Sequence, residues 1–457
     1  MWDLIKTFGI KPTNIFYEKK YAIKKADYIE LRGDKYLLIW RDIPFWMVVD
    51  SELYEFINLL DGMRTVNSII CCELRWKSNK KQIIKCLNNN VITFNNTTEK
   101  INDYRKNQFI PIQNIALNIT SSCNLHCPMC YNSNSNNRDD EISAELMIEL
   151  LKKIRAFSYK KATLTILGGE PLLVSQKLKK VCEAAVDMGL SVIVSTNGTY
   201  IDDEFIILAK KLKLEVQISL DGHNAYLNDM IRGAGMFDKV MQNIDKLVKN
   251  DVYTILSLVC HRGNLHFLND YYNLAFSLGV NEARFIPLKR LGSGDSGKLE
   301  PVGMQEIIEN VTSMLHKNPK IKKLMGRDCY SILADTCRYS TKRQSCGTGL
   351  ETLLIDSNGE IYPCINMANP EFKIADIKDD KFDFEKSWLH SAFIKEYRKQ
   401  TSIENKNSAC YNCPVKYWCL GVCRGETYHL SKKLNSNAYN CNDIKQSILE
   451  MFWILSQ

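Results

Sequence analysis

Strand-like and helix-like segments alternate six times between residues 112 and 290. The strand-like segments read IALNIT, LTILGG, SVIVSTNG, LEVQISLDG, YTILSLVC and EARFIPL. Segments such as SAELMIELLKKIRAF lie between them and carry apolar residues at helical spacing. This alternation predicts a parallel sheet with right-handed crossovers. Six units are too few for a closed eight-stranded barrel, so we expect an α/β fold with a partial (β/α)6 TIM-like barrel and chemistry at its carboxyl strand ends.

Three cysteines follow the first strand at C-x3-C-x2-C spacing: Cys123, Cys127 and Cys130. An odd number of thiols cannot close a set of disulfides, and a structural zinc ion takes a fourth ligand from nearby. A [4Fe–4S] cluster normally takes four thiolates. Three thiolates at the mouth of the barrel would therefore leave one iron free for an outside ligand.

This spacing, followed by the aromatic Tyr131, resembles the signature of the radical S-adenosylmethionine (radical SAM) enzymes. The resemblance implies that SAM binds the free iron and that the three cysteines are catalytic. In that family an electron from the cluster splits SAM, and the resulting 5′-deoxyadenosyl radical removes a hydrogen atom from the substrate. His126 lies inside the loop and is interpreted as a spacer.

Polar and glycine-rich strand ends extend the resemblance to the SAM pocket. The LGGEP stretch matches the family's GGE motif, in which the carboxylate would accept from the methionine ammonium and the glycines would allow close approach. ISLDG and DMIRGAG supply candidates for the ribose and the methionine carboxylate. The expected cofactor-binding residues are Tyr131, Gly168, Gly169, Glu170, Ser195, Asn197, Ser219, Asp221 and Arg232.

A second group of cysteines dominates the last part of the chain. CGTGLETLLIDSNGEIYPC and CYNCPVKYWCLGVC, followed by Cys441, resemble the SPASM domain of peptide-maturing radical SAM enzymes. The resemblance implies two auxiliary [4Fe–4S] clusters, and three clusters in all. The first would be held by Cys346, Cys364 and Cys423, and the second by Cys410, Cys413, Cys419 and Cys441.

Seven thiolates cannot complete two clusters that need eight. Cys337 is the expected eighth ligand and Cys329 the reserve, although some relatives leave that iron open to substrate. A zinc ribbon built on the CxxC pairs is the alternative. The other cysteines fall in apolar patterns and are expected to be buried: Cys71, Cys72, Cys86, Cys182 and Cys260.

The N-terminal part predicts a small winged-helix-like α+β module. Strands are expected at 28–33, 35–40 and 44–49, then a helix with Ser51 as N-cap and Gly62 just past its end. Two more helical segments follow at 65–75 and 78–90. The module resembles the RiPP recognition element, which binds leader peptides of ribosomally made natural products, and LLDGMRTV carries the resemblance.

In this interpretation a leader peptide adds as a strand beside residues 44–49. A purely structural domain is one alternative. DNA binding is another, but a DNA reader needs several basic side chains on one helix. The segment SNKKQIIKC contains Lys80, Lys81 and Lys85 but no arginine that could read guanine edges, so a nucleic-acid partner is not expected.

Composition limits the compartment and the partners. The chain has 17 cysteines, 60 basic and 52 acidic residues, and no apolar run of membrane-spanning length. We expect a cytoplasmic protein without a membrane partner, in which clustered cysteines indicate metal rather than disulfides. The net charge of +8 is either a solvated surface or an attraction to an acidic peptide or redox partner. The expected electron donor is a low-potential flavodoxin or ferredoxin.

The expected domains are a leader-binding domain at 1–105, the radical SAM core at 106–310, a bridging region at 311–336 and the SPASM domain at 337–457. Together they resemble RiPP maturases, above all the thioether synthases, and imply intramolecular thioether crosslinks in a precursor peptide. Other radical crosslinks and sulfatase-type Ser or Cys oxidation are alternatives. Ile365 stands where the sulfatase-maturating family has an acidic residue. A non-catalytic Fe–S or zinc DNA-binding regulator would leave the SAM-pocket residues unexplained.

Overall fold

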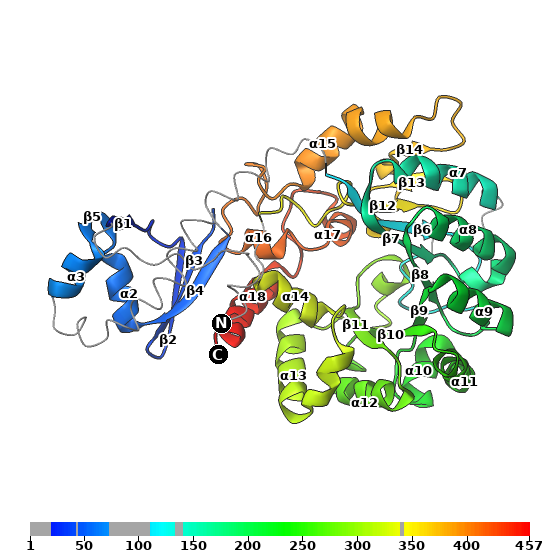
Figure 1. Ribbon diagram of the computed structural model, residues 1–457, viewed down its shortest axis with the longest axis horizontal. Coiled ribbons are helices and arrows are strands. Elements are labelled where there is room, and N and C mark those ends of the chain that lie inside the picture. The colour runs from blue at the N-terminus through cyan, green and yellow to red at the C-terminus, as the bar shows by residue number, and fades with distance from the viewer. Residues whose placement is uncertain (1–19, 43, 73–109, 133–139, 339–341) are drawn as a thin grey trace.

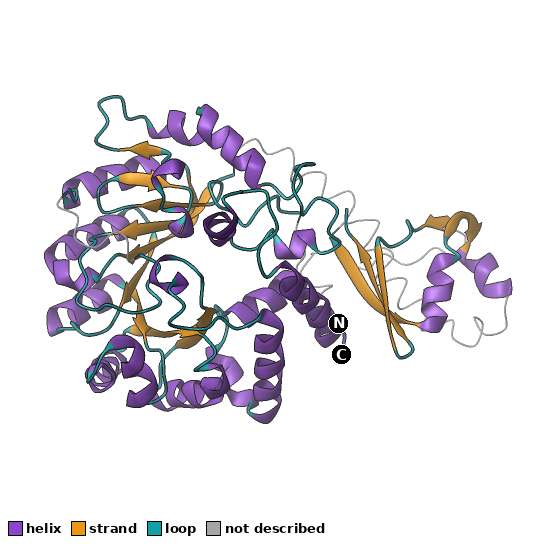
Figure 2. Ribbon diagram, turned by 180° about the vertical axis from the view of Figure 1, so that it is seen from behind, coloured by secondary structure: helices purple, strands orange, loops and turns teal. Residues whose placement is uncertain are grey.

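The computed structural model describes residues 20–42, 44–72, 110–132, 140–338 and 342–457. Three bodies follow one another along the longest axis in Figure 1: the N-terminal module in blue, a loop-rich region in orange and red, and the barrel in green. Figure 2 shows from behind that helices cover the outer face of the barrel sheet. The loop-rich region lies between the other two bodies and contacts both.

The partial barrel that the sequence predicts is confirmed. Six strands lie in chain order and run parallel in one sheet. They are β6 (Ile112–Asn118), β7 (Ser158–Leu167), β8 (Ser191–Thr196), β9 (Glu215–Ser219), β10 (Tyr253–Cys260) and β11 (Glu282–Pro287). The helices between them are α7 (Ala144–Arg155), α8 (Ser175–Asp187), α9 (Asp203–Leu212), α10 (Ala225–Arg232), α11 (Met236–Lys249) and α12 (Leu268–Leu278). Because the strands are parallel, their carboxyl ends meet at one edge.

Three further strands extend this sheet beyond β6. They are β12 (Thr352–Ile355), β13 (Glu360–Tyr362) and β14 (Ala375–Asp376). β12 pairs with β6 in parallel, while β13 pairs with β12 and β14 in antiparallel fashion. The segment between Cys346 and Cys364 is therefore a hairpin that continues the barrel sheet, an arrangement that the sequence analysis did not foresee.

The N-terminal module contains a three-stranded antiparallel sheet and two described helices. Its elements are β1 (Lys20–Ala22), β2 (Tyr28–Arg32), β3 (Lys35–Trp40), β4 (Phe45–Asp50), α2 (Ser51–Asn58), β5 (Asp61–Thr65) and α3 (Val66–Cys72). Asp50, not Ser51, is the N-cap of α2, because its carboxylate accepts from the Leu53 N–H. Gly62 lies inside β5, which pairs with β1. The expected helix at 78–90, with Cys86, lies outside the described residues.

The sheet of this module is buried on both faces. On one face Leu37 and Ile39 belong to a core with Phe452 of the C-terminal helix α18 (Cys441–Ser456). On the other face Leu38 and Trp40 pack with α2 residues. This double burial explains why KYLLIW is a continuous apolar run rather than an alternating one.

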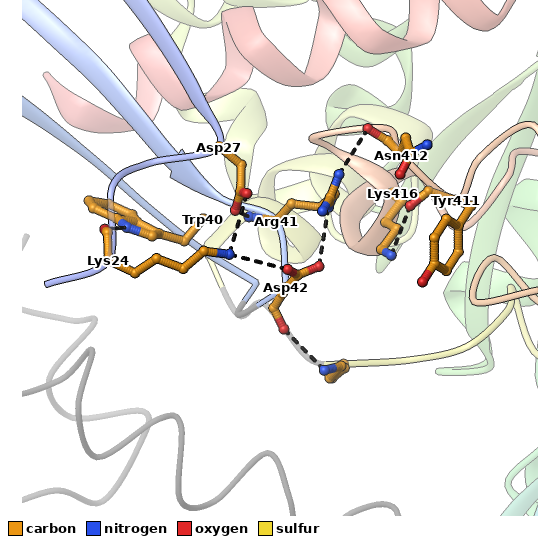
Figure 3. Close-up of polar contacts among 9 residues, drawn as sticks. Lys24, Asp27, Trp40, Arg41, Asp42, Tyr411, Asn412 and Lys416 are labelled. Atoms are coloured by element: carbon orange, nitrogen blue, oxygen red, sulfur yellow. Dashed lines mark hydrogen bonds and ion pairs between the residues drawn. The ribbon is translucent and has the colours of Figure 1, made fainter. Parts of the chain in front are cut away.

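Polar contacts join the same module to the cysteine-rich region. Arg41 donates to the backbone carbonyl of Asn412 over 3.4 Å, and Lys342 donates to that of Asp42 over 3.0 Å (Figure 3). Trp46 Nε1 donates to the carbonyl oxygen of Cys337 over 2.8 Å. The N-terminal module is thus packed against the C-terminal region rather than tethered beside it.

Helices and loops complete the C-terminal half. The helices are α13 (Met304–Lys317), α14 (Cys329–Arg338), α15 (Ala392–Thr401), α16 (Lys416–Cys419), α17 (Arg424–Ser431) and α18. Within the described residues, no helix combines the length and apolar character needed to cross a bilayer.

Two of the cysteines outside the motifs depart from expectation. Cys182 and Cys260 are buried as predicted, but Cys71 and Cys72 are exposed. The reason is local, because α3 buries Val66, Ile69 and Ile70 and then ends at Cys72.

Candidate functional site: three groups of thiols

The first three cysteines lie together in the loop that follows β6. Burial is the largest influence on Cys123, Cys127 and Cys130 and raises the pKa of each thiol. The positive charge of Arg232 partly opposes this rise in all three thiols. Its Nη1 lies 3.6 Å from Cys127 Sγ. A cation beside the thiols favours the thiolate form that binds metal.

Gly168 and Gly169 lie at the end of β7, where the cysteine loop crosses it. The Gly169 N–H donates to the Thr120 carbonyl over 2.8 Å, and the Glu170 N–H donates to that of Ser122 over 2.8 Å. A Cβ at position 169 would clash with the Ser122 carbonyl oxygen at 2.0 Å, so only glycine fits at this position. The close approach in this structure is therefore between two backbone segments, and it fixes the start of the cysteine loop.

Glu170 is fully buried at the same strand end. Its carboxylate accepts hydrogen bonds from the Thr196 hydroxyl at 2.6 Å, the Asn197 N–H at 2.7 Å and the Leu172 N–H at 3.1 Å. Burial raises the pKa of this carboxyl, against the effect of these bonds. The carboxylate thus holds the end of β8 against β7, and its contact with the SAM amino group remains a prediction.

Asn197 connects β8 to the cysteine loop. Its Nδ2 donates to Asn124 Oδ1 over 2.8 Å, and Asn124 Nδ2 donates to Thr199 Oγ1 over 3.0 Å. Because Asn124 directly follows Cys123, this pair helps to orient the cysteine loop.

Asp221 and Arg232 form a buried ion pair beside Cys127. Arg232 Nε lies 2.6 Å from Asp221 Oδ2, and the Asp221 side chain is fully buried. The other carboxylate oxygen accepts from the Val259 N–H over 2.8 Å. Asp221 therefore joins the ends of β9 and β10 and aims the guanidinium of Arg232 at the thiols.

The remaining pocket candidates line the same barrel. Ser195 Oγ accepts from Gln217 Nε2 over 3.0 Å, and Ser219 lies opposite Ser257 in the register of β9 and β10. The Tyr131 hydroxyl is buried and has no hydrogen-bond partner among the described residues. Their role toward SAM remains a prediction.

A second group of thiols lines a cavity of ≈ 400 Å³ between the extended sheet and the C-terminal loops. Its walls include Cys346, Cys364 and Cys423, the three residues expected to hold the first auxiliary cluster. Ala116 and Thr165 of the barrel strands also line it. The cavity therefore opens between the cysteines of the hairpin and the barrel sheet.

Two basic side chains, Lys289 and Arg424, also line this cavity. Burial lowers the pKa of Lys289, but the charges of Cys423, Glu426 and Cys364 raise it more, so the net shift is upward. Both cations favour thiolates in this cavity.

A third group contains Cys410, Cys413, Cys419 and Cys441. Burial raises the pKa of the last three thiols, and the charge of Cys410 raises each of them further. A charge that acts on all three thiols is consistent with the second auxiliary cluster expected at these four cysteines. None of these four cysteines lines the cavity of Cys346, Cys364 and Cys423, and the assignment of the seven cysteines to two clusters remains a prediction.

The structure does not bring Cys337 or Cys329 to the cavity. Cys337 is fully buried in the apolar core between β3 and α18, and burial is the sole influence on its raised pKa. Cys329 begins α14 and packs against the barrel core near Cys260. Neither residue lines the cavity of Cys346, so the expected fourth protein ligand is not supplied there by these two cysteines.

The loop after β11 connects the first two groups. The Ser293 N–H donates to the Cys130 carbonyl over 2.9 Å, and the Arg290 N–H donates to Glu426 of α17 over 2.8 Å. Lys289, the residue directly before Arg290, lines the cavity together with Cys423. One short loop therefore contacts the first cysteine loop and the cavity at once.

Several residues of these groups escaped the sequence analysis. Glu141 accepts from the Ser121 N–H and from the Thr120 and Ser121 hydroxyls, which fixes the end of β6. Lys289 and Arg424 have no motif of their own. Arg424 could have been suspected because it directly follows a cluster cysteine, whereas Glu141 and Lys289 reach their sites only through the fold.

Among the described residues, no three His, Cys, Asp or Glu side chains converge tightly enough to hold a single metal ion. A [4Fe–4S] cluster is larger, since each of its thiolates binds a different iron. The thiol donors, the adjoining cations and a cavity of ≈ 400 Å³ fit such a cluster at Cys346, Cys364 and Cys423.

Comparison with known proteins identifies two domains. Residues 117–266 match the radical SAM superfamily, and residues 346–414 match the iron–sulfur cluster-binding domain called SPASM. The chain is 28% identical over 332 residues to "Mycofactocin maturase MftC" of Mycolicibacterium smegmatis, covering 71% of this chain and 81% of the relative. It is 24% identical over 419 residues to "Antilisterial bacteriocin subtilosin biosynthesis protein AlbA" of Bacillus subtilis, covering 87% and 88%.

Solved structures share the fold. The structure "Native anSMEcpe with bound AdoMet" superposes with a TM-score of 0.62 at 19% identity, covering 76% of this chain and 98% of that chain. SuiB of Streptococcus suis bound to the precursor peptide SuiA gives a TM-score of 0.60 at 15% identity, covering 91% and 100%.

The protein therefore has a radical SAM fold, a TIM-like α/β barrel, with a C-terminal SPASM domain. These two domains imply SAM and [4Fe–4S] clusters as cofactors, auxiliary clusters included. The loop of Cys123, Cys127 and Cys130 lies inside the first match, and Cys346 to Cys413 lie inside the second.

Proposed function

We propose that this protein is a radical SAM peptide maturase that forms intramolecular thioether crosslinks in a ribosomally made, cysteine-containing precursor. The carrying observation is the cavity beside the barrel, which has three thiols and neither Cys337 nor Cys329 in its walls. A cluster held there by three thiolates has one iron without a cysteine ligand, and a substrate thiolate is its natural fourth ligand. The names of two relatives, a mycofactocin maturase and a bacteriocin biosynthesis protein, support the same substrate class.

The proposed reaction removes two hydrogens for each link. SAM and the first cluster supply a 5′-deoxyadenosyl radical when bound. One substrate C–H bond breaks and its hydrogen atom ends in 5′-deoxyadenosine; the substrate S–H loses a proton, and a C–S bond forms. The resulting radical must then lose one electron, and the proposed acceptor is an auxiliary [4Fe–4S] cluster. A flavodoxin or ferredoxin is the proposed source of the electron that starts the reaction.

Residues of this chain have definite parts in the proposal. Cys123, Cys127 and Cys130 hold the SAM-binding cluster, and Arg232 favours their thiolate form. Lys289 places a cation against Cys423, which favours binding of anions in the cavity. Ile365, also in the cavity wall, puts an apolar side chain where a sulfatase-maturating enzyme has an acidic base.

The N-terminal sheet is proposed to dock the leader peptide. Among the described strands, β4 pairs only with β3, so its other edge is open to an added strand. The sheet is anchored to α18 by Trp46, which stacks on Phe452 with ring centroids 4.6 Å apart. A peptide held at β4 would therefore be held by a rigid part of the enzyme.

The test is the product mass and its thiol count after co-expression with a small precursor encoded beside the gene. Each thioether should lower the mass by about two daltons and remove one alkylatable cysteine, because two hydrogens and one free thiol disappear per link. A two-dalton loss with every thiol still free would indicate a carbon–carbon link or a side-chain oxidation and would refute the thioether.

A further inference from the structure

Arg424 lies between the two auxiliary groups of thiols. It is the first residue of α17 and is 1% exposed. Its Nη2 donates to Cys410 Sγ over 3.7 Å, and Arg424 is also a lining residue of the cavity of Cys346, Cys364 and Cys423. One residue thus adjoins two groups that the sequence assigns to different clusters.

The hydrogen bonds of this guanidinium are incomplete. Its Nη1 donates to the Ser436 carbonyl over 3.2 Å, but its Nε is buried and has no partner among the described residues. Its two partners are a thiol and a carbonyl rather than a carboxylate. A buried donor without an acceptor is unfavourable, so the Nε–H of Arg424 needs an acceptor that the described residues do not provide.

The backbone is shaped around the same side chain. Leu420, Gly421 and Val422 have φ angles of 53°, 80° and 61°, in the left-handed region that non-glycine residues rarely adopt. A Cβ at position 421 would lie 2.0 Å from Arg424 Nη2. The turn from Cys419 to Cys423 therefore accepts an unfavourable conformation that leaves room for the guanidinium.

The positive charge of Arg424 lies beside cysteines of both groups. Its Nη2 donates to Cys410 Sγ over 3.7 Å, and Arg424 lines the cavity whose walls include Cys346, Cys364 and Cys423. A positive charge and N–H donors directed at cluster sulfurs stabilise the more negative, reduced state of a cluster.

We propose that Arg424 is a positioning residue shared by both auxiliary clusters, donating to Cys410 of one and presenting its Nε–H to the other, so that it raises both reduction potentials together. The proposal rests on the clusters of the proposed function. It adds that a single side chain sets the reduction potentials of both auxiliary clusters, so that its loss changes both.

The test is a redox titration of reconstituted full-length protein followed by electron paramagnetic resonance. Cys123, Cys127 and Cys130 are replaced by alanine in the parent, so that the auxiliary signals are observed alone. Arg424→Gln should lower the midpoint potentials of both auxiliary clusters. Arg398→Gln is the matched control, since this arginine is also partly buried in the C-terminal region but donates to the Gly349 carbonyl. It should leave both potentials unchanged.

Two further variants guard against loss of assembly. Gly421→Ala keeps the arginine but displaces its guanidinium, and should shift both potentials in the same direction as Arg424→Gln. If Arg424→Gln fails to hold iron, Arg424→Lys decides, because it loses the planar fork through which one side chain would donate to both clusters. A lowered potential in these loaded variants supports the proposal.

Unchanged potentials, or a shift confined to one cluster, would overturn the shared role of Arg424. A parent protein that lacks auxiliary clusters altogether would instead refute the proposed function. Iron and sulfide content of the parent, measured first, separates the two failures.

Discussion

Two groups of three cysteines occupy this molecule, and they are built in different ways. Cys123, Cys127 and Cys130 come from a single loop of eight positions, held by backbone bonds from Gly169 and Glu170. Cys346, Cys364 and Cys423 come from segments far apart in the chain and meet only around a cavity. The first group is therefore a local motif on a strand end, while the second depends on tertiary packing.

The electrostatic settings of the two groups differ as well. Arg232 at the first group is paired with the buried carboxylate of Asp221. At the cavity, Lys289 interacts with the charges of Cys423 and Glu426, and the partners of Arg424 among the described residues are a thiol and a carbonyl. The first group thus has a cation whose direction is fixed by an ion pair, whereas the cavity has cations turned toward the thiols themselves.

The largest expected effect separates the two groups completely. Replacing Cys123, Cys127 and Cys130 by alanine should abolish reductive SAM cleavage, because no thiolate remains to hold the SAM-binding cluster. The auxiliary absorption near 400 nm, on the order of two clusters' worth, should persist. Formation of 5′-deoxyadenosine, followed by chromatography, is the measurement, and continued formation would disprove the assignment of the first group.

The next effect concerns the cavity. Cys364→Ser or Cys423→Ser should lower iron from about twelve to about eight per chain, since one of three four-iron clusters is lost. SAM cleavage should continue without crosslinked product. Cys182→Ala, which alters a buried cysteine of the barrel core, is the control and should keep its iron. Zinc in place of the missing iron would favour the ribbon alternative.

A smaller effect is expected at Arg232. If it also binds the methionine carboxylate of SAM, Arg232→Gln removes a charge-assisted contact of about 1.5–3 kcal/mol. SAM should then bind about ten- to a hundredfold more weakly. Equilibrium binding to the reconstituted enzyme measures this directly. Because the same change leaves Asp221 buried without its partner, Arg232→Lys is the second variant, and unchanged affinity in both would exclude the contact.

The smallest effect concerns the N-terminal sheet, none of whose residues lines the cavity. A leader peptide added beside β4 should slow hydrogen exchange of amides in Phe45–Asp50 about two- to tenfold, as expected for a net hydrogen bond of about 0.5–1.5 kcal/mol. The strand β2 at the opposite edge serves as the internal control. Protection of β2 alone would place the peptide on the wrong edge for the proposed docking mode.

Local patterns predicted the barrel well. The six strands and the cysteine loop follow from residues that are neighbours in sequence, so periodicity and spacing suffice for them. The hairpin β12–β13 was missed as a part of the barrel sheet, because its pairing with β6 joins residues more than 200 positions apart. Ser51 was preferred over Asp50 as the helix cap for a simpler reason, since both residue types cap helices and only the geometry decides.

The prediction for Cys337 shows the same limit. Its spacing of nine residues from Cys346 suggested a fourth ligand, but the apolar contacts of α14 with β3 and α18 place it in a core. Sequence spacing does not reveal which neighbouring elements pack against the face of α14 that carries Cys337. Glu170, in contrast, was found from its motif, and its three hydrogen bonds give that motif a structural reason.

The parallel pairing of β12 with β6 has a consequence for the size of the ring in the proposed reaction. β6 leads into the first cysteine loop, and β12 lies between Cys346 and Cys364, so the first group and two of the three cavity cysteines are attached to one hydrogen-bonded sheet. A continuous sheet has no hinge between neighbouring strands, and the separation of the two groups is set when the chain folds. The substrate peptide must then span the distance between the two groups, and its extended chain covers at most about 3.3–3.6 Å per residue. This fixed distance would set a minimum number of residues between the two crosslinked positions. In a precursor with fewer residues between them, the peptide would not reach both groups at once.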